Sequence, residues 1–458
     1  MAKLMSYRKS SQSTDELGRA PVGKLMVKLA IPAILAQLIN MLYNIVDRIY
    51  IGRMPNVGAL ALTGLGVCGP IIIIVSAFAA LVAMGAAPRA SIEMGKGNQE
   101  EAERILGASF MLQVVLSVIL TTVLLIWGEP LLMLFGASEH TIGYALDYLR
   151  IYALGTVFVQ LTLGMNAFVT AQGFARLSMM TVLIGAITNI VLDPIFIFVF
   201  DMGVAGAAWA TIISQAISCL WVVYFIAGKR TNIRLQKKHM RLDVQVLLPC
   251  MALGLSPFVM QSSESVLAIV FNTSLQRHGG DLAVGAMTIC TTVMQFAMMP
   301  LQGLAQGAQP ISSYSYGAGN AGRVKKTFRY LVTSSLVYAG LLWALVQLFP
   351  QAVAGIFTSN QALAAFLMGI QVACQMTFIS IDNAKSSIIV AVFRKFVFLI
   401  PLILILPNFF ADKTMAIFLA EPVADTVAVL FTVFMFSREF SRAMKALKSP
   451  PLQEIPAI

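Results

Sequence analysis

Long apolar runs alternate with short polar segments along the whole chain. A helix crosses the roughly 30 Å hydrocarbon core of a membrane in about twenty residues, and windows of that length predict twelve spans. The spans begin near Leu25, Gly58, Ile105, Ile142, Leu177, Val204, Val244, Leu282, Thr327, Ala362, Phe393 and Thr414. The runs lack the strict alternation of a membrane barrel, and lipid offers no water to backbone groups, so each span must be an α-helix. The pattern predicts an all-α integral membrane protein.

The composition supports this class. The 458 residues are 58% hydrophobic and only 12% charged, which lies far outside the usage of soluble domains. Cysteines are scattered singly, without metal-ligand or disulfide spacing, at Cys68, Cys219, Cys250, Cys290 and Cys374. We expect these cysteines to be small buried apolar side chains.

Lysine and arginine are distributed unevenly between the predicted loops. Short cytoplasmic loops retain positive charge, and with the amino terminus in the cytoplasm most of the 32 basic residues face that side. The exceptions are Arg48, Arg53, Arg150, Arg277 and Lys413. Both termini are therefore predicted to be cytoplasmic, and the net charge of +11 is explained by anionic lipid headgroups without a nucleic-acid partner. The first residues contain no apolar signal region, so the first span should act as its own insertion signal.

The chain contains an internal repeat. A shift of 222 residues places Pro88, Ser91, Gly95, Gly97 and Asn98 on Pro310, Ser313, Gly317, Gly319 and Asn320. Each half holds six predicted spans, so both halves enter the membrane in the same direction, related by an axis along the membrane normal. We predict a cytoplasmic arm (1–24), an amino-terminal six-helix bundle (25–228), a cytoplasmic linker (229–243), a carboxy-terminal six-helix bundle (244–440) and a cytoplasmic tail (441–458). Such repeats enclose a central cleft and rock to alternate access, which makes transport the leading interpretation.

Polar side chains able to ligate a cation interrupt the apolar amino-terminal spans. They are Tyr43, Asp47, Asn166, Asn189, Asp193 and Thr211. The first span has one polar face, because polar residues recur there at three- and four-residue intervals from Gln37 through Asn40 and Asn44 to Asp47. An ionised acid in hydrocarbon costs several kcal/mol unless it faces a cavity, a partner or an ion. These acids are therefore candidates for a functional site.

The two acids are predicted to lie at the same depth. Counted from the neighbouring loops, Asp47, Asp193 and Thr211 fall within roughly 8 to 12 Å of the outer ends of their spans. Asn189 lies one turn before Asp193, and Pro194 frees a backbone carbonyl as a further ligand. Two ionised carboxylates in one dehydrated pocket repel each other, so the pair should hold a proton or a cation. A site that alternates between neutral and anionic states suits an exchanger.

Several short motifs then point to one family. They are Ile31-Pro32-Ala33 with Asp47 and Gly52, the two Pro-to-Gly-x-Gly-Asn loops, Leu192-Asp193-Pro194, Gly254 to Glu264, Met299-Pro300-Leu301-Gln302-Gly303, Gln306-Gly307-Ala308-Gln309-Pro310 and Leu399-Ile-Pro-Leu402. In this combination the chain resembles the multidrug and toxic compound extrusion (MATE) family, in the branch of DinF-like and MepA-like exporters. The resemblance covers essentially the whole length.

The resemblance implies a MATE/MOP-type fold and export of amphipathic, often cationic drugs or toxic compounds in exchange for H+ or Na+. It implies a coupling site made of Tyr43, Asp47, Asn166, Asn189, Asp193 and Thr211. If sodium is the coupling ion, Asp47, Asn189 and Asp193 would bind it. No cofactor is expected. We expect a monomer in the prokaryotic cytoplasmic (inner) membrane, with small-molecule substrates and membrane lipids as partners.

The carboxy-terminal half offers a second acid and an uncharged polar stripe. Glu264 resembles the acid that other branches of the family use for a second cation site. On the eighth span glutamines recur beside methionines, and flexible thioethers suit varied substrates, although Met also serves as core filler. We assign to the substrate cavity Gln37, Asn40, Gln261, Met294, Gln295, Met298, Gln302 and Gln306.

Each of these residues also has a purely structural interpretation. Asp47 and Asp193 would then be acids bonded to neighbouring helices, and the amides and hydroxyls would make ordinary interhelical hydrogen bonds. Glu264 would be satisfied by the serines around it. The pairing and common depth of the two aspartates favour function.

Three other functions were weighed against antiport. A flippase for a lipid-linked precursor or other lipid-like substrate shares the fold, but it needs cationic residues in the cavity for phosphate, whereas most Lys and Arg here are predicted at the cytoplasmic face. An enzyme is disfavoured because no nucleophile-base pair or metal-ligand set occurs and the histidines lie in loops. A channel is also disfavoured. Two repeats with acids buried to one side suit a transporter that works by alternating access better than a channel.

Overall fold

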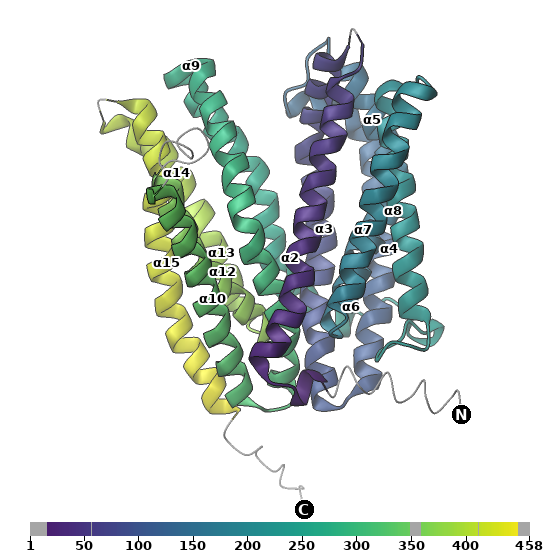
Figure 1. Ribbon diagram of the computed structural model, residues 1–458, viewed down its shortest axis with the longest axis vertical. Helices are drawn as coiled ribbons and strands as arrows, with labels where there is room; N and C mark the ends of the chain where they lie inside the picture. Colours follow the sequence, from purple (N-terminus) through teal and green to yellow (C-terminus); the bar gives the residue numbers. More distant parts are fainter. Residues whose placement is uncertain (1–15, 56, 349–358, 411, 448–458) are drawn as a thin grey trace, which may run out of the picture.

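The computed structural model describes residues 16–55, 57–348, 359–410 and 412–447. Every regular element in these segments is a helix, which confirms the predicted all-α membrane fold (Figure 1). Eight of the helical segments are long and apolar enough to cross a membrane, and α5 with α6 forms a ninth if the two, bent by 57°, are one span.

The helices follow one another with short connections. The amino-terminal half contains α2 (Val22–Gly52), α3 (Gly58–Lys96), α4 (Gln99–Leu134), α5 (Ile142–Leu154), α6 (Thr156–Ala171), α7 (Ala175–Pro194), the π-helical turn η1 (Ile195–Val199) and α8 (Gly203–Ala227). The carboxy-terminal half follows a 3-10 turn η2 (Lys237–His239). It contains α9 (Val244–Gly317), α10 (Ala321–Leu348), α12 (Ser359–Ser380), α13 (Ala384–Val392), the π-helical turn η3 (Phe393–Leu399), α14 (Ile400–Ile405), the 3-10 turn η4 (Leu406–Asn408) and α15 (Lys413–Ala446). We call α2–α8 the amino-terminal bundle and α9–α15 the carboxy-terminal bundle.

The long element α9 holds the predicted seventh and eighth spans. Its 74 residues would extend about 110 Å as one straight helix. Its first residue follows Asp243, which pairs with Arg104 on α4, and its last residue, Gly317, packs on Ile92 of α3. Arg104 and Ile92 lie close to the turn between α3 and α4. Both ends of α9 therefore lie at the same end of the molecule, and the segment must run out and return.

The repeated Gly-x-Gly-Asn loops form tight turns, as expected. Gly97 and Gly319 end their helices with φ of 80° and 69°, in the left-handed region that favours glycine. The side chains of Asn98 and Asn320 then accept hydrogen bonds from backbone N–H groups of the next helix. These turns define what we call the basic end of the molecule, and the opposite end is the distal end.

The two bundles touch backbone to backbone near the basic end. A side chain at Gly95 would overlap the carbonyl of Tyr314, and one at Gly317 would overlap the carbonyl of Ile92. Gly317 and Tyr314 are the positions that the 222-residue shift places on Gly95 and Ile92. Each half of the repeat therefore makes the same contact with the other. In Figure 1 the two bundles meet near the basic end and their ribbons diverge toward the distal end.

A short segment before α2 is wedged into this junction. Leu17 is 1% exposed and packs with Ala305, Ala308 and other residues of the carboxy-terminal bundle. Arg323 on α10 donates hydrogen bonds to the carbonyl oxygens of Leu17 (2.6 Å) and Ala20 (2.8 Å). The described part of the predicted amino-terminal arm is therefore packed between the helices.

The start of the eleventh span differs from the prediction. A window of apolar residues places it near Phe393, but the helix begins at Ala384, where Asn383 caps it by accepting from the Ser386 N–H (3.1 Å). Arg394 and Lys395 belong to the basic residues predicted in the cytoplasmic loops, but they lie inside the span and are 6% and 3% exposed. The assignment was wrong because both cations are neutralised by acids of other helices.

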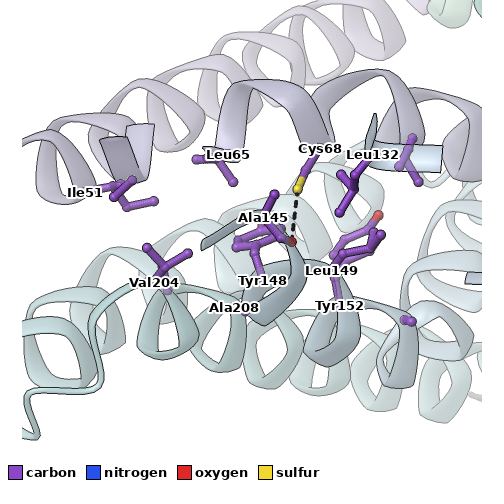
Figure 2. Packing of buried hydrophobic residues seen from close by; sticks show 14 of the residues in the cluster. Ile51, Leu65, Cys68, Leu132, Ala145, Tyr148, Leu149, Tyr152, Val204 and Ala208 are labelled. Carbon is purple, nitrogen blue, oxygen red and sulfur yellow. Dashed lines mark hydrogen bonds between the residues drawn. The ribbon is translucent and has the colours of Figure 1, made fainter. Parts of the chain in front are cut away.

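Four cysteines are buried thiols without a disulfide, as expected: Cys68, Cys219, Cys250 and Cys374. The side chain of Cys290 lies outside the described residues. Figure 2 shows the Cys68 thiol donating to the Ala145 carbonyl (3.4 Å) inside a core that α3, α5 and α8 build around Tyr148 and Tyr152. This core fixes α5 beside the polar residues of the amino-terminal bundle.

Candidate functional site

Two aspartates from different helices meet inside the amino-terminal bundle. Asp47 on α2 and Asp193 on α7 are 7% and 0% exposed, and their carboxyl groups lie close enough to interact directly. α2 packs along α7, so the polar face of the first span is turned toward the fifth span. We call Asp47 and Asp193 the acid pair. The structure thus brings together the two acids expected at one depth.

Polar side chains surround the acid pair. The Asn189 amide donates to Asp193 (3.1 Å) and lies 3.5 Å from the Thr211 hydroxyl on α8. The Tyr43 phenol, one turn before Asp47 on α2, lies close to both acids. Four of the five other predicted coupling positions therefore gather around Asp193.

Two tyrosines of α5 also belong to the site, although they were not predicted. Tyr148 lies close to Thr211 and to Asp47, and Tyr152 lies near Tyr43. Both rings are almost fully buried and stack at a centroid distance of 6.1 Å. The sequence feature that could have pointed to these tyrosines is their spacing of four residues, which places both on one face of a helix. It was ambiguous because aromatic residues at that spacing usually serve packing.

In the part of the chain that the structure describes, the acid pair has no basic ion-pair partner. Among the described residues, no Lys or Arg lies within ion-pair distance of either carboxylate. Arg48 is the nearest basic neighbour of Asp47, and its side chain is exposed. Two buried like charges without a counter-charge repel strongly. The pair therefore requires a proton or a small cation when the helices pack as they do here.

The oxygen atoms present fit a hard monovalent cation as well as a proton. Asp47 Oδ1, Asp193 Oδ2 and Asn189 Oδ1 are buried and have no hydrogen-bond partner in the described part of the chain. Oxygen ligands of this kind are those that hard cations prefer. No cluster of three or more His, Cys, Asp or Glu that could hold a metal occurs among these residues. The geometry suits a site that exchanges a small ion.

Asn166 does not join the acid pair. Its amide donates to the Ser178 carbonyl on α7 (3.3 Å). Ser178 precedes Asn189 by eleven residues, which corresponds to roughly 16 Å along a helix. Asn166 sits near the turn between α6 and α7, where its amide N–H makes an interhelical hydrogen bond while its Oδ1 has no partner among the described residues. The structure does not bring Asn166 together with the acid pair, and its role in the coupling site stays a prediction.

Glu264, the predicted second acid, lies in a group of charged residues that we call the carboxy-terminal charge network. It comprises Glu264 on α9, Arg394 and Lys395 on η3, and Glu421 and Asp425 on α15. Arg394 donates to Asp425 (2.7 Å), and their side chains are 7% and 0% exposed. The buried Lys395 pairs with Glu264, whose side chain is exposed.

This pairing changes the interpretation of Glu264. The Lys395 ammonium already takes the place of a monovalent cation beside the Glu264 carboxylate. Glu421 lies close to both cations of the network. The prediction missed Arg394 and Lys395 because they were placed in a loop, although two adjacent cations in the run Val390 to Ile400 were a visible signal.

The tentative substrate residues are only partly supported. Asn40, Gln295 and Gln302 are exposed, and Gln37, Gln261 and Gln306 are half-buried. α2 and α9 touch where Ile34 meets Gly303, one turn from Gln37 and Gln306, so these two glutamines flank the contact between the bundles. Met298 is 8% exposed and packs with Met294, Leu301 and Tyr338. Met298 therefore packs inside the carboxy-terminal bundle and Met294 is half-buried beside it, and their place in a substrate cavity stays a prediction.

Comparison with known proteins gives a consistent result. The sequence model of the family described as MatE matches residues 32–195 and 257–405. Multidrug export protein MepA of Staphylococcus haemolyticus is 26% identical over 351 residues, covering 75% of this chain and 76% of the relative. MepA of Staphylococcus aureus is 27% identical over 365 residues, covering 78% of each chain.

Solved structures share the fold. A crystal structure of MATE in the bent conformation superposes with a TM-score of 0.89 at 23% identity, covering 95% of this chain and 99% of that one. A MOP superfamily transporter from Pyrococcus furiosus, described as having a binding pocket of reverse polarity, gives a TM-score of 0.86 at 23% identity, covering 95% and 98%.

Proposed function

Because the chain belongs to the MatE family of membrane transporters, we propose that it is a secondary active antiporter. It exports amphipathic, often cationic compounds and takes up H+ or Na+ in exchange. The names of the two MepA relatives support the export of drugs. The exchange with an ion rests on residues of this chain.

The observation that carries the proposal is the acid pair without a counter-charge. Two carboxylates in contact, enclosed by helices, are stable only when they share a proton or bind a cation. The site is therefore neutralised by one species that is small and positive. Losing that species restores the repulsion between α2 and α7.

The helix that carries Asp193 is built to respond to this change. Pro194 and the π-helical turn η1 follow Asp193 directly. Proline and π-helical turns interrupt the regular hydrogen-bond ladder, which permits bending. Binding of the ion then favours one packing of α7, and its release favours another. Such a difference in affinity between two arrangements is the requirement for alternating access.

Imposed gradients across a proteoliposome membrane test the exchange. Purified protein is reconstituted with a cationic dye inside, and efflux is followed after a pH jump and, separately, after a sodium jump. We expect one of the two ion gradients to accelerate efflux of the dye above the rate measured without a gradient. If neither gradient drives the dye, the antiporter proposal is wrong.

Neutral variants link the exchange to the acid pair. Asp193→Asn and Asp47→Asn are expected to fold and insert but to lose gradient-driven efflux, because neither can exchange a cation. Asp201→Asn is the matched control. It lies at the exposed turn before α8 with φ of 51°, a conformation that asparagine tolerates. Normal efflux by either acid-pair variant would contradict the mechanism.

A lipid flippase remains the alternative within this fold. Such a protein needs free cationic groups for phosphate, and Arg394 and Lys395 do lie in the interior of the carboxy-terminal bundle. Both are already paired with carboxylates, as is Arg89 with Asp382 (3.3 Å). Including a phosphate-bearing lipid-like compound in the gradient assay separates the two functions.

The setting of the transporter follows from its charge distribution. We propose that it is a monomer in the cytoplasmic (inner) membrane, with both termini and the linker 229–243 in the cytoplasm. The basic end would then face the anionic leaflet. Its partners would be membrane lipids and small amphipathic substrates, without a nucleic acid or an organic cofactor.

A further inference from the structure

A second group of buried polar side chains lies in the amino-terminal bundle, away from the acid pair. Ser109 and Gln113 on α4 and Gln160 on α6 are each 0% exposed. They come from helices that pack on one another and on α3. Buried amides and hydroxyls in a membrane bundle are costly unless they form hydrogen bonds.

The hydrogen bonds of this group are incomplete. Gln160 donates to the Val75 carbonyl on α3 (2.7 Å), but its Oε1 has no partner. Both amide atoms of Gln113 and the Ser109 hydroxyl also lack partners among the described residues. Ser117, one turn after Gln113, differs because it donates to the Val114 carbonyl of its own helix (2.7 Å).

The Gln113 amide of α4 lies against α6, one helical turn from Gln160. A side chain at Gly164 would overlap the Gln113 amide, so the amide occupies space that this glycine leaves open. Gly164 follows Gln160 by one helical turn, and Gln113 follows Ser109 by one turn. Together they offer a donor, a hydroxyl and two amide acceptors within about two turns of helix.

This arrangement matches the requirements of buried water. A buried water molecule makes about three hydrogen bonds to otherwise unsatisfied polar groups. A sodium ion would need more oxygen ligands and a carboxylate, and neither Gln113, Gln160 nor Ser109 carries charge. The chemistry of the group therefore favours water over a metal ion.

The group lies between the acid pair and the basic end. Toward the distal end, Thr156 is one turn from Gln160 and donates to the Tyr152 carbonyl (3.3 Å), and Tyr152 lies near Tyr43. Toward the basic end, Ser109 is six residues from Glu103, or roughly 9 Å along α4. The Glu103 carboxylate there accepts from Gln236 (2.5 Å) and from the Arg234 N–H (3.1 Å) of the linker.

We propose that Ser109, Gln113 and Gln160 hold a chain of water molecules inside the amino-terminal bundle, and that this water carries protons from the acid pair toward the basic end. The inference rests on the proposed ion exchange and adds a route for the ion separate from the contact between the bundles. The substrate and the proton would then leave the protein by different paths.

Apolar variants of matching shape test the route. Gln113→Leu and Gln160→Leu are reconstituted with a pH-sensitive dye inside the vesicles, and substrate-dependent proton flux is measured under an imposed pH gradient. We expect proton flux to fall by about tenfold or more, because a step in proton transfer is lost, with substrate affinity unchanged. Ser117→Ala is the control on the same helix and should conduct normally.

Stability and labelling separate a water site from a mere packing defect. If the amide of Gln113 is simply unsatisfied, Gln113→Leu should raise the melting temperature in detergent and leave proton flux intact, which would overturn the proposal. Hydroxyl radicals generated from bound water should oxidise Met165, which is fully buried beside Gly164. We expect this oxidation in the unmodified protein and less of it in Gln113→Leu. Equal labelling of the two would also overturn the proposal.

The gradient assays distinguish this inference from the proposed function. Proton-driven efflux by the unmodified protein with unchanged flux in Gln113→Leu and Gln160→Leu defeats the water route alone. Efflux driven only by sodium also defeats the route while leaving ion exchange in place. Efflux driven by neither gradient defeats the antiporter, and the route with it.

Discussion

The two bundles handle buried charge in opposite ways. In the amino-terminal bundle, Asp47 and Asp193 face each other and no basic side chain forms an ion pair with them among the described residues. In the carboxy-terminal bundle, Asp425 faces Arg394 and Glu264 faces Lys395. The first arrangement must obtain its positive charge from solution. The second carries two positive charges on the chain, so of its three acids only Glu421 lies outside the two ion pairs.

The difference arises on equivalent helices. The fifth span of each bundle contains a π-helical turn, η1 after Asp193 and η3 around Arg394. A wide turn accommodates a charged residue inside a span because it disturbs the backbone ladder locally. A π-helical turn therefore accompanies an acid in the amino-terminal bundle and two cations in the carboxy-terminal bundle.

The largest expected effect is on the stability of the carboxy-terminal bundle. Asp425→Asn removes the partner of the buried Arg394 guanidinium and should cost about 3 to 5 kcal/mol, because an uncompensated buried charge remains. Thermal unfolding of the detergent-solubilised protein measures the loss. The double variant Arg394→Met with Asp425→Leu removes both charges and should regain most of the stability. A melting temperature unchanged by Asp425→Asn would show that the ion pair is not a structural element.

The same substitution in the amino-terminal bundle should act in the opposite direction. Asp193→Asn removes one of two like charges and should raise the apparent stability by about 1 kcal/mol at high pH, where both carboxylates would otherwise be ionised. The difference should shrink as the pH falls and a proton neutralises the pair. Melting curves across a pH series, with Asp201→Asn alongside, measure this. A destabilised Asp193→Asn would mean that the acids are structural.

A smaller effect is expected from the tyrosine beside Thr211. Tyr148→Phe keeps the ring in its core and removes only the phenol oxygen, so the loss of stability should be about 1 kcal/mol or less. Efflux at limiting ion concentration should weaken several-fold, while efflux at saturating ion should be nearly normal. Tyr144→Phe on the same helix is the control. A change confined to the maximal rate would place Tyr148 outside the ion site.

The smallest effect is expected at Asn166. Asn166→Ala removes the hydrogen bond to the Ser178 carbonyl and should lower stability by about 1 kcal/mol or less without changing the ion dependence of efflux. Dose–response curves for H+ and Na+ measure that dependence. A shift in either curve would support a place for Asn166 in the coupling site.

The acid pair could be predicted from the sequence because each of its signals is local. Asp47 ends a polar face with helical spacing, and Asn189 and Asp193 are one turn apart in an otherwise apolar run. A carboxylate is rare in such an apolar run, so few explanations other than a functional role account for its presence there. The twelve spans and the fold class could be predicted for the same reason, since lipid imposes length and helicity on each segment.

The features that could not be predicted concern contacts between distant segments. Arg394 and Lys395 were misplaced because their acid partners lie on other spans, and the sequence window contained only the cations. Asn166 has a suitable residue type, but its depth depends on where the turn between α6 and α7 falls. Tyr148 and Gln113 carry no local signal that separates a polar role from packing. The roles of these residues become clear only when their neighbours in the folded structure are known.

The crossing of Gly95 and Gly317 has a mechanical consequence. Because the backbones touch there without intervening side chains, the two halves of the molecule share a fulcrum close to one end. Close backbone contacts continue along α3 as far as Leu81, which Gly254 of α9 meets. The tip of α3 at Gly58 lies beyond this last contact at the end of a lever arm of roughly 35 Å, so a tilt of about 10° moves it by about 6 Å. A displacement too small to disturb the fulcrum is thereby magnified into one large enough to admit a small molecule.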